Sequence, residues 1–488
     1  MSRQNPKVNL NVAGPNFLFL MSDEHLREAA GCYDSDIVQT PNLDRLAKNG
    51  TRFTQAYTPS PVCVPARAAL ATGQYAHQNR YWSNAQAYDG RIPSWAHRLT
   101  DNGNLCVSIG KLHYQGSGND NGFDEEYFPL HVRDGQGWIR GLLRKDPPIW
   151  EKAREFAEQI GPGECEYTQF DRDVCDKACN WLGNEAPRYT DKPWTLFVSF
   201  VSPHYPLVVP SEFYNLYPDD QMELPCLTGT DELPRHPVVQ GVRSFMNYED
   251  YFDDDKKRKA RAAYFGLCTF LDDNIGKVLN ALDESGQAEN TTVLYTSDHG
   301  ELLGNHGMWT KCVMYEESAA IPMIISGNSI PKNDICDTPT SLVDCYPTIL
   351  ENAEIELTDE ETNLPGVSLA RIANGEKPHR TLLSEYHDGG SITGMFMIRY
   401  GQWKYIHYPG YPPQLFDVEN DSCEATDLGE SNAHSDVVVE CEKRLRQIIN
   451  PDAANDLALS DQALRIEELG GREGILAMED YDHTPVST

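Results

Sequence analysis

Continuous apolar runs that end in polar or ionisable residues recur along the chain. Each run lacks strict alternation, which predicts strands buried on both faces of a parallel sheet. The three clearest runs are residues 16–21 before Ser22-Asp23-Glu24-His25, residues 195–201 before Ser202-Pro203-His204, and residues 291–295 before Ser297-Asp298-His299. Because ligand groups gather at the carboxyl ends of such strands, these polar tips indicate one shared site.

Helix candidates separate the strand candidates at residues 42–49, 259–285 and 341–352. This alternation is typical of an α/β fold, and it predicts an α/β sandwich around a large, mostly parallel central sheet. A chain of 488 residues is long enough for two domains, or for one large domain with an appendage.

The pattern changes at about residue 385. Two short alternating runs, residues 393–400 and 402–408, are joined at Gly401 and predict an antiparallel hairpin. A helix is expected at residues 435–449. These elements predict a smaller α+β subdomain with an antiparallel sheet at the carboxyl end.

We therefore divide the chain into a large domain at residues 1–384, which carries the shared site, and a C-terminal subdomain and tail at residues 385–488. The tail is acidic and aromatic from residue 478 onward. It is expected either to be mobile or to dock on a neighbouring subunit, so a homo-oligomer is one option.

The formal net charge of −33 excludes nucleic acid and anionic membranes as expected partners, because a phosphate surface would be repelled. Thirteen cysteines without Cys-x-x-Cys pairs indicate reduced thiols. No apolar run is long enough to span a membrane. Residues 1–14 lack the pattern of a secretory signal, so we expect a cytoplasmic protein.

Carboxylates at two strand tips form the first candidate site. Asp23 and Glu24 follow one run, and Asp298 and His299 follow another. Such oxygen-rich ligands suit a hard divalent cation, with Ca²⁺ as the first choice and Mn²⁺ as the rival because one imidazole is present. Asp298 alone could equally cap the next helix.

A lysine and a histidine form the second candidate site, in Gly110-Lys111-Leu112-His113. Their side chains lie on the same side of an extended strand end, because side chains alternate with period two. Together they could clamp an anion and carry a proton. The alternative is a solvated lysine beside a packed histidine.

The third candidate is a cysteine at the start of a predicted helix, in Cys63-Val64-Pro65-Ala66-Arg67. A buried structural cysteine is the alternative interpretation. The segment resembles the sulfatase signature, in which Cys-x-Pro-x-Arg directs oxidation of the cysteine to formylglycine, an aldehyde that hydrates to a diol.

Other segments carry the same resemblance. They are Asp23, the Lys111 and His113 pair, Ser297-Asp298-His299-Gly300, and Thr40-Pro41-Asn42-Leu43-Asp44-Arg45-Leu46. Glu24 departs from the more usual Asp or Gln of the family. The chain thus resembles type I, formylglycine-dependent sulfatases of the alkaline phosphatase superfamily, which implies an alkaline-phosphatase-like sandwich.

The resemblance implies hydrolysis of a small sulfate monoester to an alcohol and inorganic sulfate. A formylglycine-generating enzyme would be needed as a maturation partner, to convert Cys63. One divalent cation would be bound beside it. The ligands that the resemblance implies are Asp23, Glu24, Cys63, Asp298 and His299.

The resemblance also implies catalytic roles. The residues concerned are Cys63, Arg67, Lys111, His113, His204 and Lys311. Arg67 would stabilise the developing alkoxide, and the two lysines would offset charge on the sulfuryl oxygens. His204, with Lys311, would protonate the departing alcohol, and His113 would help the diol to expel sulfate.

Much of the chain, residues 17–428, resembles the choline-sulfatase branch, which would place Asn84 and Trp138 near the substrate. Glu385 could add a carboxylate there. The Trp138 face suits a quaternary ammonium group. Arg140, Arg144 and Lys145 follow it and would fit an anionic or sugar substrate better. Asn84 and Trp138 could also be core residues.

Relatives that hydrolyse phosphonate monoesters and phosphodiesters are the alternative reading of the same resemblance. These enzymes tend to lack the Lys-x-His pair formed here by Lys111 and His113. The pair therefore favours sulfate esters.

Overall fold

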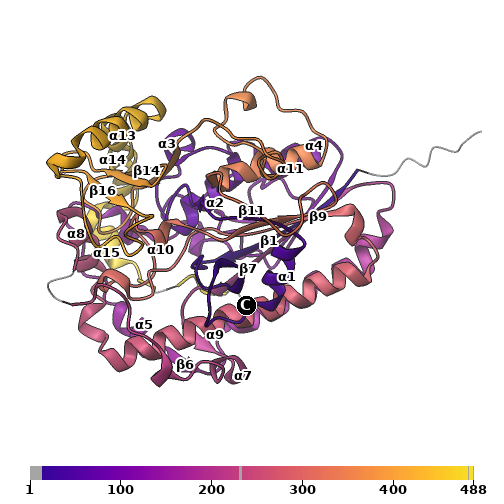
Figure 1. Ribbon diagram of the computed structural model, residues 1–488, viewed down its shortest axis with the longest axis horizontal. Helices are drawn as coiled ribbons and strands as arrows, with labels where there is room; N and C mark the ends of the chain where they lie inside the picture. Colours follow the sequence, from indigo (N-terminus) through magenta and orange to yellow (C-terminus); the bar gives the residue numbers. More distant parts are fainter. Residues whose placement is uncertain (1–13, 230–232, 482, 487–488) are drawn as a thin grey trace, which may run out of the picture.

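The central sheet is built from the predicted apolar runs (Figure 1). The computed structural model describes residues 14–229, 233–481 and 483–486. These form an eight-stranded sheet of order β11-β2-β10-β9-β1-β7-β4-β5. Neighbours from β9 to β5 pair in parallel, and β10 is antiparallel to both of its neighbours. The strands are β1 (Asn16–Asp23), β2 (Gly50–Phe53), β4 (Leu105–Gly110), β5 (Glu125–Tyr127), β7 (Trp194–Pro203), β9 (Thr291–Ser297), β10 (Met323–Ser326) and β11 (Asp334–Cys336). The predicted α/β class with a mostly parallel sheet is confirmed.

Strand β1 is buried along its whole length because helices cover both faces of the sheet. Leu18 and Leu20 pack with residues of α1, α6 and α9. Phe17 and Phe19 point to the opposite face and pack with residues of α2, α4 and α11. The helices are α1 (Pro41–Lys48), α2 (Cys63–Thr72), α4 (Trp95–Asp101), α6 (Glu166–Asn180), α9 (Asp254–Glu284) and α11 (Cys345–Asn352). Burial on both faces explains why the run lacks alternation.

Three of these helices, α1, α9 and α11, correspond to the predicted helical segments. The long α9 starts where the Asp253 side chain accepts a hydrogen bond from the Lys256 N–H, which satisfies one of the free amides of the first turn. In Figure 1, α9 runs beneath the sheet, and α2, α4 and α11 lie above it.

A second, four-stranded sheet is antiparallel throughout, in the order β13-β14-β15-β16. The predicted hairpin is present, with Tyr400 opposite Trp403 across the turn. Figure 1 shows this sheet with α13 and α14 at one end of the molecule, in orange and yellow. The elements are β13 (Leu382–Tyr386), β14 (Met395–Tyr400), β15 (Trp403–His407), β16 (Gln414–Asp417), α13 (Ser435–Ile448), α14 (Pro451–Glu468) and α15 (Gly471–Ala477).

Within the described ranges, no helix combines the length and the apolar composition needed to cross a membrane. The expectation drawn from residues 1–14 concerns a segment that, except for Gly14, lies outside the described residues.

Candidate active site

The central strands bring carboxylates together at one edge of the sheet. Strands β1 and β9 pair in register, with Ser22 opposite Ser297, so Asp23 and Asp298 follow neighbouring strand positions. The chain then turns at Glu24, which has a φ of 67°, and the Glu24 N–H donates to the Asp298 carboxylate at 3.1 Å. The predicted meeting of strand tips is therefore seen for this pair.

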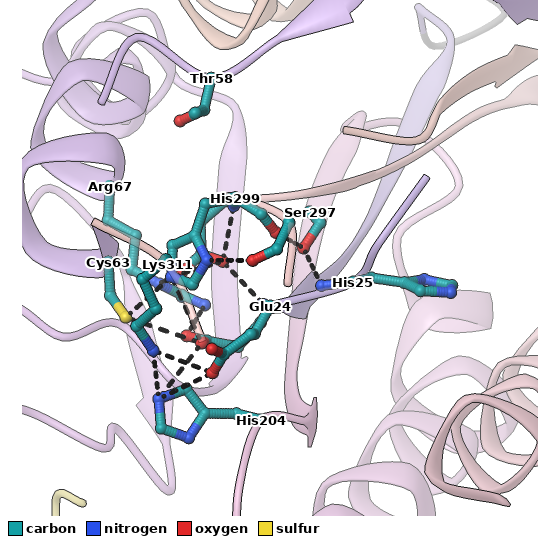
Figure 2. Close-up of polar contacts among 12 residues, drawn as sticks. Glu24, His25, Thr58, Cys63, Arg67, His204, Ser297, His299 and Lys311 are labelled. Atoms are coloured by element: carbon teal, nitrogen blue, oxygen red, sulfur yellow. Dashed lines mark hydrogen bonds and ion pairs between the residues drawn. The ribbon is translucent and has the colours of Figure 1, made fainter. Parts of the chain in front are cut away.

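Cys63 is the first residue of α2, and its sulfur points at these strand ends (Figure 2). The Sγ atom lies 3.6 Å from Asp23 Oδ1 and 3.1 Å from His299 Nε2. Burial raises the pKa of the Cys63 thiol well above its ordinary value, and the Asp23 carboxylate raises it further. Since the thiolate is the reactive form, the unmodified side chain is a poor nucleophile.

Four of the five predicted metal ligands form one compact, buried group. Their donor atoms all lie within 4.8 Å of one another, and the group is Asp23, Cys63, Asp298 and His299. Two carboxylates and one imidazole in such a group suit a divalent cation. Glu24 lies instead in a second group, with Asp23 and His204. We call Asp23, Cys63, Arg67, Asp298 and His299 the floor of the site.

Arg67 fixes the two floor carboxylates. Its Nε donates to Asp298 Oδ2 at 2.8 Å and its Nη2 donates to Asp23 Oδ2 at 3.0 Å. Its Nη1 donates to the Lys111 carbonyl and to the Ser199 hydroxyl. Burial lowers the pKa of Arg67, but the two carboxylates outweigh burial and raise it. Because all three nitrogens already have partners, Arg67 orients the carboxylates that surround the sulfur.

Two buried lysines form ion pairs with the carboxylates of Asp23 and Glu24. Lys111 Nζ lies 2.8 Å from Asp23 Oδ2, and Lys311 Nζ lies 2.8 Å from Glu24 Oε2. Burial raises the pKa of Asp23, but nearby charges, Lys111 foremost and Arg67 among them, hold it well below its ordinary value. The site thus sets three cationic side chains, Arg67, Lys111 and Lys311, beside three buried carboxylates.

His204 lies next to Lys311 (Figure 2), and the partners of its two ring nitrogens fix its tautomer. Its Nε2 lies 2.8 Å from Lys311 Nζ, and its Nδ1 lies 2.7 Å from the Tyr205 carbonyl oxygen. An ammonium group can only donate, so Nε2 accepts, and the proton on Nδ1 is donated to the carbonyl. Burial lowers the pKa of His204 well below its ordinary value, and Lys311 lowers it further. The proton available at this edge therefore resides on Lys311.

The end of the chain contacts the site, and nothing in the sequence motifs indicated this. His113 Nε2 lies 2.9 Å from the Thr484 hydroxyl, and Tyr167 OH donates to the Thr484 carbonyl at 2.7 Å. Burial lowers the pKa of His113 well below its ordinary value, as does Lys111. The tail therefore docks on its own chain here, next to a predicted catalytic residue.

A pocket opens above the floor and is lined by both predicted and unpredicted residues. The predicted residues among them are Cys63, Asn84, Lys111, His113, Trp138, His204 and Lys311. Several aromatic and tail residues line the pocket as well, and they are Trp150, Tyr167, Tyr205, Tyr248, Tyr481 and Thr484. No motif marks them, because Tyr167 is a core residue in the first turn of α6 and the others come from loops and from the tail. We call Asn84, Trp138, Tyr481 and Thr484 the wall of the pocket.

Asn84 and Trp138 are anchored by their polar atoms. Asn84 Oδ1 accepts a hydrogen bond from the Val64 N–H at 3.1 Å, in the first turn of α2. Trp138 Nε1 donates to Asp480 Oδ1 at 3.3 Å. Asn84 therefore supports the helix that carries Cys63, while the Trp138 ring lines the pocket.

Glu385 is not brought to the pocket. Its carboxylate is fully buried and lies 2.7 Å from His77 Nδ1 and 3.4 Å from His387 Nε2. Burial raises the pKa of Glu385, but His77 and His387 lower it to about 2. The expected substrate contact is replaced by an internal ion pair, because Glu385 lies within β13 of the second sheet.

Two family profiles match the chain. The sulfatase family profile matches residues 15–355, and the profile described as N-sulphoglucosamine sulphohydrolase, C-terminal, matches residues 304–451. The chain is 32% identical to a choline-sulfatase of Rhizobium meliloti (strain 1021), covering 86% of this chain and 83% of the relative. It is also 32% identical to the uncharacterized sulfatase YidJ of Escherichia coli (strain K12), covering 87% and 84%.

Solved structures share the fold at lower identity. The phosphonate monoester hydrolase of Silicibacter pomeroyi superposes with a TM-score of 0.72 at 23% identity, covering 89% of this chain and 94% of that one. At this identity the likeness establishes the fold alone.

Proposed function

Because the chain belongs to the sulfatase family and is a sulfuric ester hydrolase, we propose that it cleaves a small sulfate monoester with formylglycine made from Cys63. The position of the Cys63 sulfur carries the proposal, since it lies among the floor carboxylates and faces the pocket. A buried, protonated thiol is a poor nucleophile, whereas a hydrated aldehyde at the same place offers hydroxyl groups.

A divalent cation fits the floor. Asp23, Asp298, His299 and the modified residue 63 would hold it, with Ca²⁺ favoured by the carboxylates and Mn²⁺ as the rival. When bound, the cation would supply positive charge that activates an oxygen nucleophile and neutralises sulfuryl oxygens. Glu24 could join the ligands only if its ion pair with Lys311 gave way.

The two lysines and two histidines of the pocket would bind the sulfate group and transfer protons. Lys111 and Lys311 would bind sulfuryl oxygens, which is supported by the position of both residues in the pocket lining together with residue 63. Lys311 is the proton source for the departing alcohol, directly or through His204, which accepts its hydrogen bond. His113 is a neutral base that can take a proton from the diol.

The wall supports a small, uncharged or cationic alcohol. Trp138 presents an aromatic face to which a quaternary ammonium group could bind. Arg140 faces the tail, where its Nη2 donates to the Met478 carbonyl, and Arg144 donates to the Ser391 carbonyl and to Gln462. Both arginines, which the sequence suggested as contacts for an anionic or sugar substrate, are thus engaged in hydrogen bonds within the protein.

Mass spectrometry and a substrate panel test the proposal together. After coexpression with a formylglycine-generating enzyme, the peptide that contains Cys63 should carry the aldehyde, and the protein should prefer an aryl or alkyl sulfate to an aryl phosphonate monoester. Cys63→Ala should abolish turnover and still bind the cation. A persistent thiol with no turnover of any sulfate ester, or a preference for the phosphonate, would overturn it.

A further inference from the structure

Two cysteines outside the pocket lie close enough to bond. The sulfur atoms of Cys226 and Cys423 are 3.2 Å apart, although 197 residues separate them along the chain. Cys226 is exposed and Cys423 is half-buried. A disulfide has an S–S length of about 2.05 Å, so the two sulfurs need to approach by only about 1 Å.

Each of these cysteines is tied to one end of the segment that carries Lys311. The Cys226 N–H donates to Asn305 Oδ1 at 2.8 Å, and the Cys226 carbonyl accepts from the His306 N–H at 3.2 Å. The residue after Cys423 is Glu424, whose Oε2 accepts from the Glu316 N–H at 2.6 Å. A bond between the two sulfurs would therefore connect the two ends of residues 305–316, because each end is hydrogen-bonded to Cys226 or to the residue after Cys423.

Both ends of the segment are packed as well as hydrogen-bonded. His306 stacks on Tyr315, with ring centroids 3.8 Å apart and planes inclined by 8°. Glu424 also forms a buried ion pair with Lys404 of β15, at 2.9 Å. The segment is thus held between the large domain and the second sheet, and the thiol pair spans the same junction.

We propose that Cys226 and Cys423 form a reversible disulfide that fixes the Lys311 segment against the second sheet. The oxidant is a low-molecular-weight disulfide of the glutathione type. The exposed Cys226 thiolate attacks it and releases one thiolate. Cys423 then loses its proton, attacks the Cys226 sulfur and releases the second. In total, two protein thiols and one small disulfide yield one protein disulfide and two small thiols.

The surroundings of Cys423 agree with this order of events. Burial and the neighbouring Cys226 sulfur raise the pKa of Cys423 to about 11, so it stays protonated while Cys226 reacts. Thiol–disulfide exchange depends on access, and the exposed Cys226 is the more accessible of the two sulfurs, so it is the first to react.

Redox titration with peptide mapping tests the proposal. The purified full-length protein is equilibrated with mixtures of reduced and oxidised glutathione, the thiols are alkylated, and the peptides are identified. A Cys226–Cys423 cross-link should form, and excess reduced glutathione should remove it. Oxidation should raise the midpoint of thermal unfolding by about 5 °C and slow amide exchange in residues 305–316. Both effects should be absent from Cys226→Ser.

Two further variants make the result decisive. Cys423→Ser should trap glutathione on Cys226 as a mixed disulfide. Cys336→Ser, which changes a half-buried cysteine elsewhere, should cross-link as the wild type does. Failure of the wild type to cross-link, or a cross-link that leaves both the midpoint and the exchange unchanged, would overturn the proposal. Neither readout depends on turnover.

Discussion

The floor and the wall of the pocket are built in different ways. The floor comes from the ends of β1 and β9 and the first turn of α2, and each of its charged side chains has an oppositely charged or hydrogen-bonding partner. The wall comes from loops and from the C-terminal tail, and single hydrogen bonds anchor its residues. Ion pairs fix the floor, whereas hydrogen bonds from loops and the tail fix the wall.

The pKa values of two buried carboxylates, one in the floor and one behind the wall, differ accordingly. Asp23 in the floor has a pKa well below its ordinary value, because nearby cations outweigh its burial. Asp388 supports the wall through a hydrogen bond from the Asn84 N–H, and burial raises its pKa to about 6. Similar burial therefore leaves one carboxylate charged at neutral pH and brings the other close to titration.

The largest effect is expected from Arg67→Met, which leaves Asp23 and Asp298 without their shared partner. Loss of one side of a buried ion pair costs about 3–5 kcal/mol, and kcat/KM should fall by roughly 10³-fold or more because the carboxylates lose their orientation. Urea unfolding and sulfate-ester turnover would measure both. A stable, active Arg67→Met variant would show that the floor does not depend on pairing.

The next effect concerns pH and Asp388. The folded state holds the Asp388 proton more tightly than the unfolded state, whose pKa is near 3.8. Its contribution is therefore present below pH 3.8 and is lost as the pH rises through about 6. Across that window the unfolding free energy of the wild type should fall by about 3 kcal/mol relative to Asp388→Asn.

Urea denaturation of both proteins at pH 4 and pH 7 measures this change in the unfolding free energy. Any constant cost of the substitution cancels in the difference between the two pH values. Parallel pH profiles for the wild type and the variant would contradict the assignment.

A smaller effect is expected from Trp138→Ala, which removes an aromatic surface from the wall and leaves the floor intact. The KM for small sulfates should rise by about tenfold with little change in kcat. Trp403→Ala, in the second sheet outside the pocket, is the matched control and should leave KM unchanged. If kcat fell instead, the Trp138 ring would be acting on the floor.

The smallest effect is expected from Thr484→Val, which removes the hydroxyl beside His113. One lost hydrogen bond corresponds to about 1 kcal/mol, so kcat should fall by roughly fivefold with stability nearly unchanged. Thr484→Ser keeps a hydroxyl and should restore the wild-type rate. Equal rates in all three proteins would show that the tail does not position His113.

Most of the floor could be predicted because strand periodicity and a local motif mark it. The buried run before Asp23 and the run before Asp298 predicted strands of one parallel sheet with their ends at a shared site, and the structure pairs these two strands directly. The α/β class followed from the same alternation and is confirmed. The resemblance to sulfatases is confirmed by the family match.

The wall could not be predicted in the same way. Thr484 has no neighbouring motif, and only folding of the tail places it beside His113. Glu385 was expected in the pocket, yet its strand directs it to His77. No sequence pattern shows that Thr484 lies beside the pocket and Glu385 does not, because this depends on how distant parts of the chain pack together.

The docking of Thr484 against His113 bears on how the protein should be handled. A protease that cuts the backbone between α15 and Thr484 would release the hydroxyl that lies beside His113. Batches that differ in specific activity should therefore first be compared by intact mass.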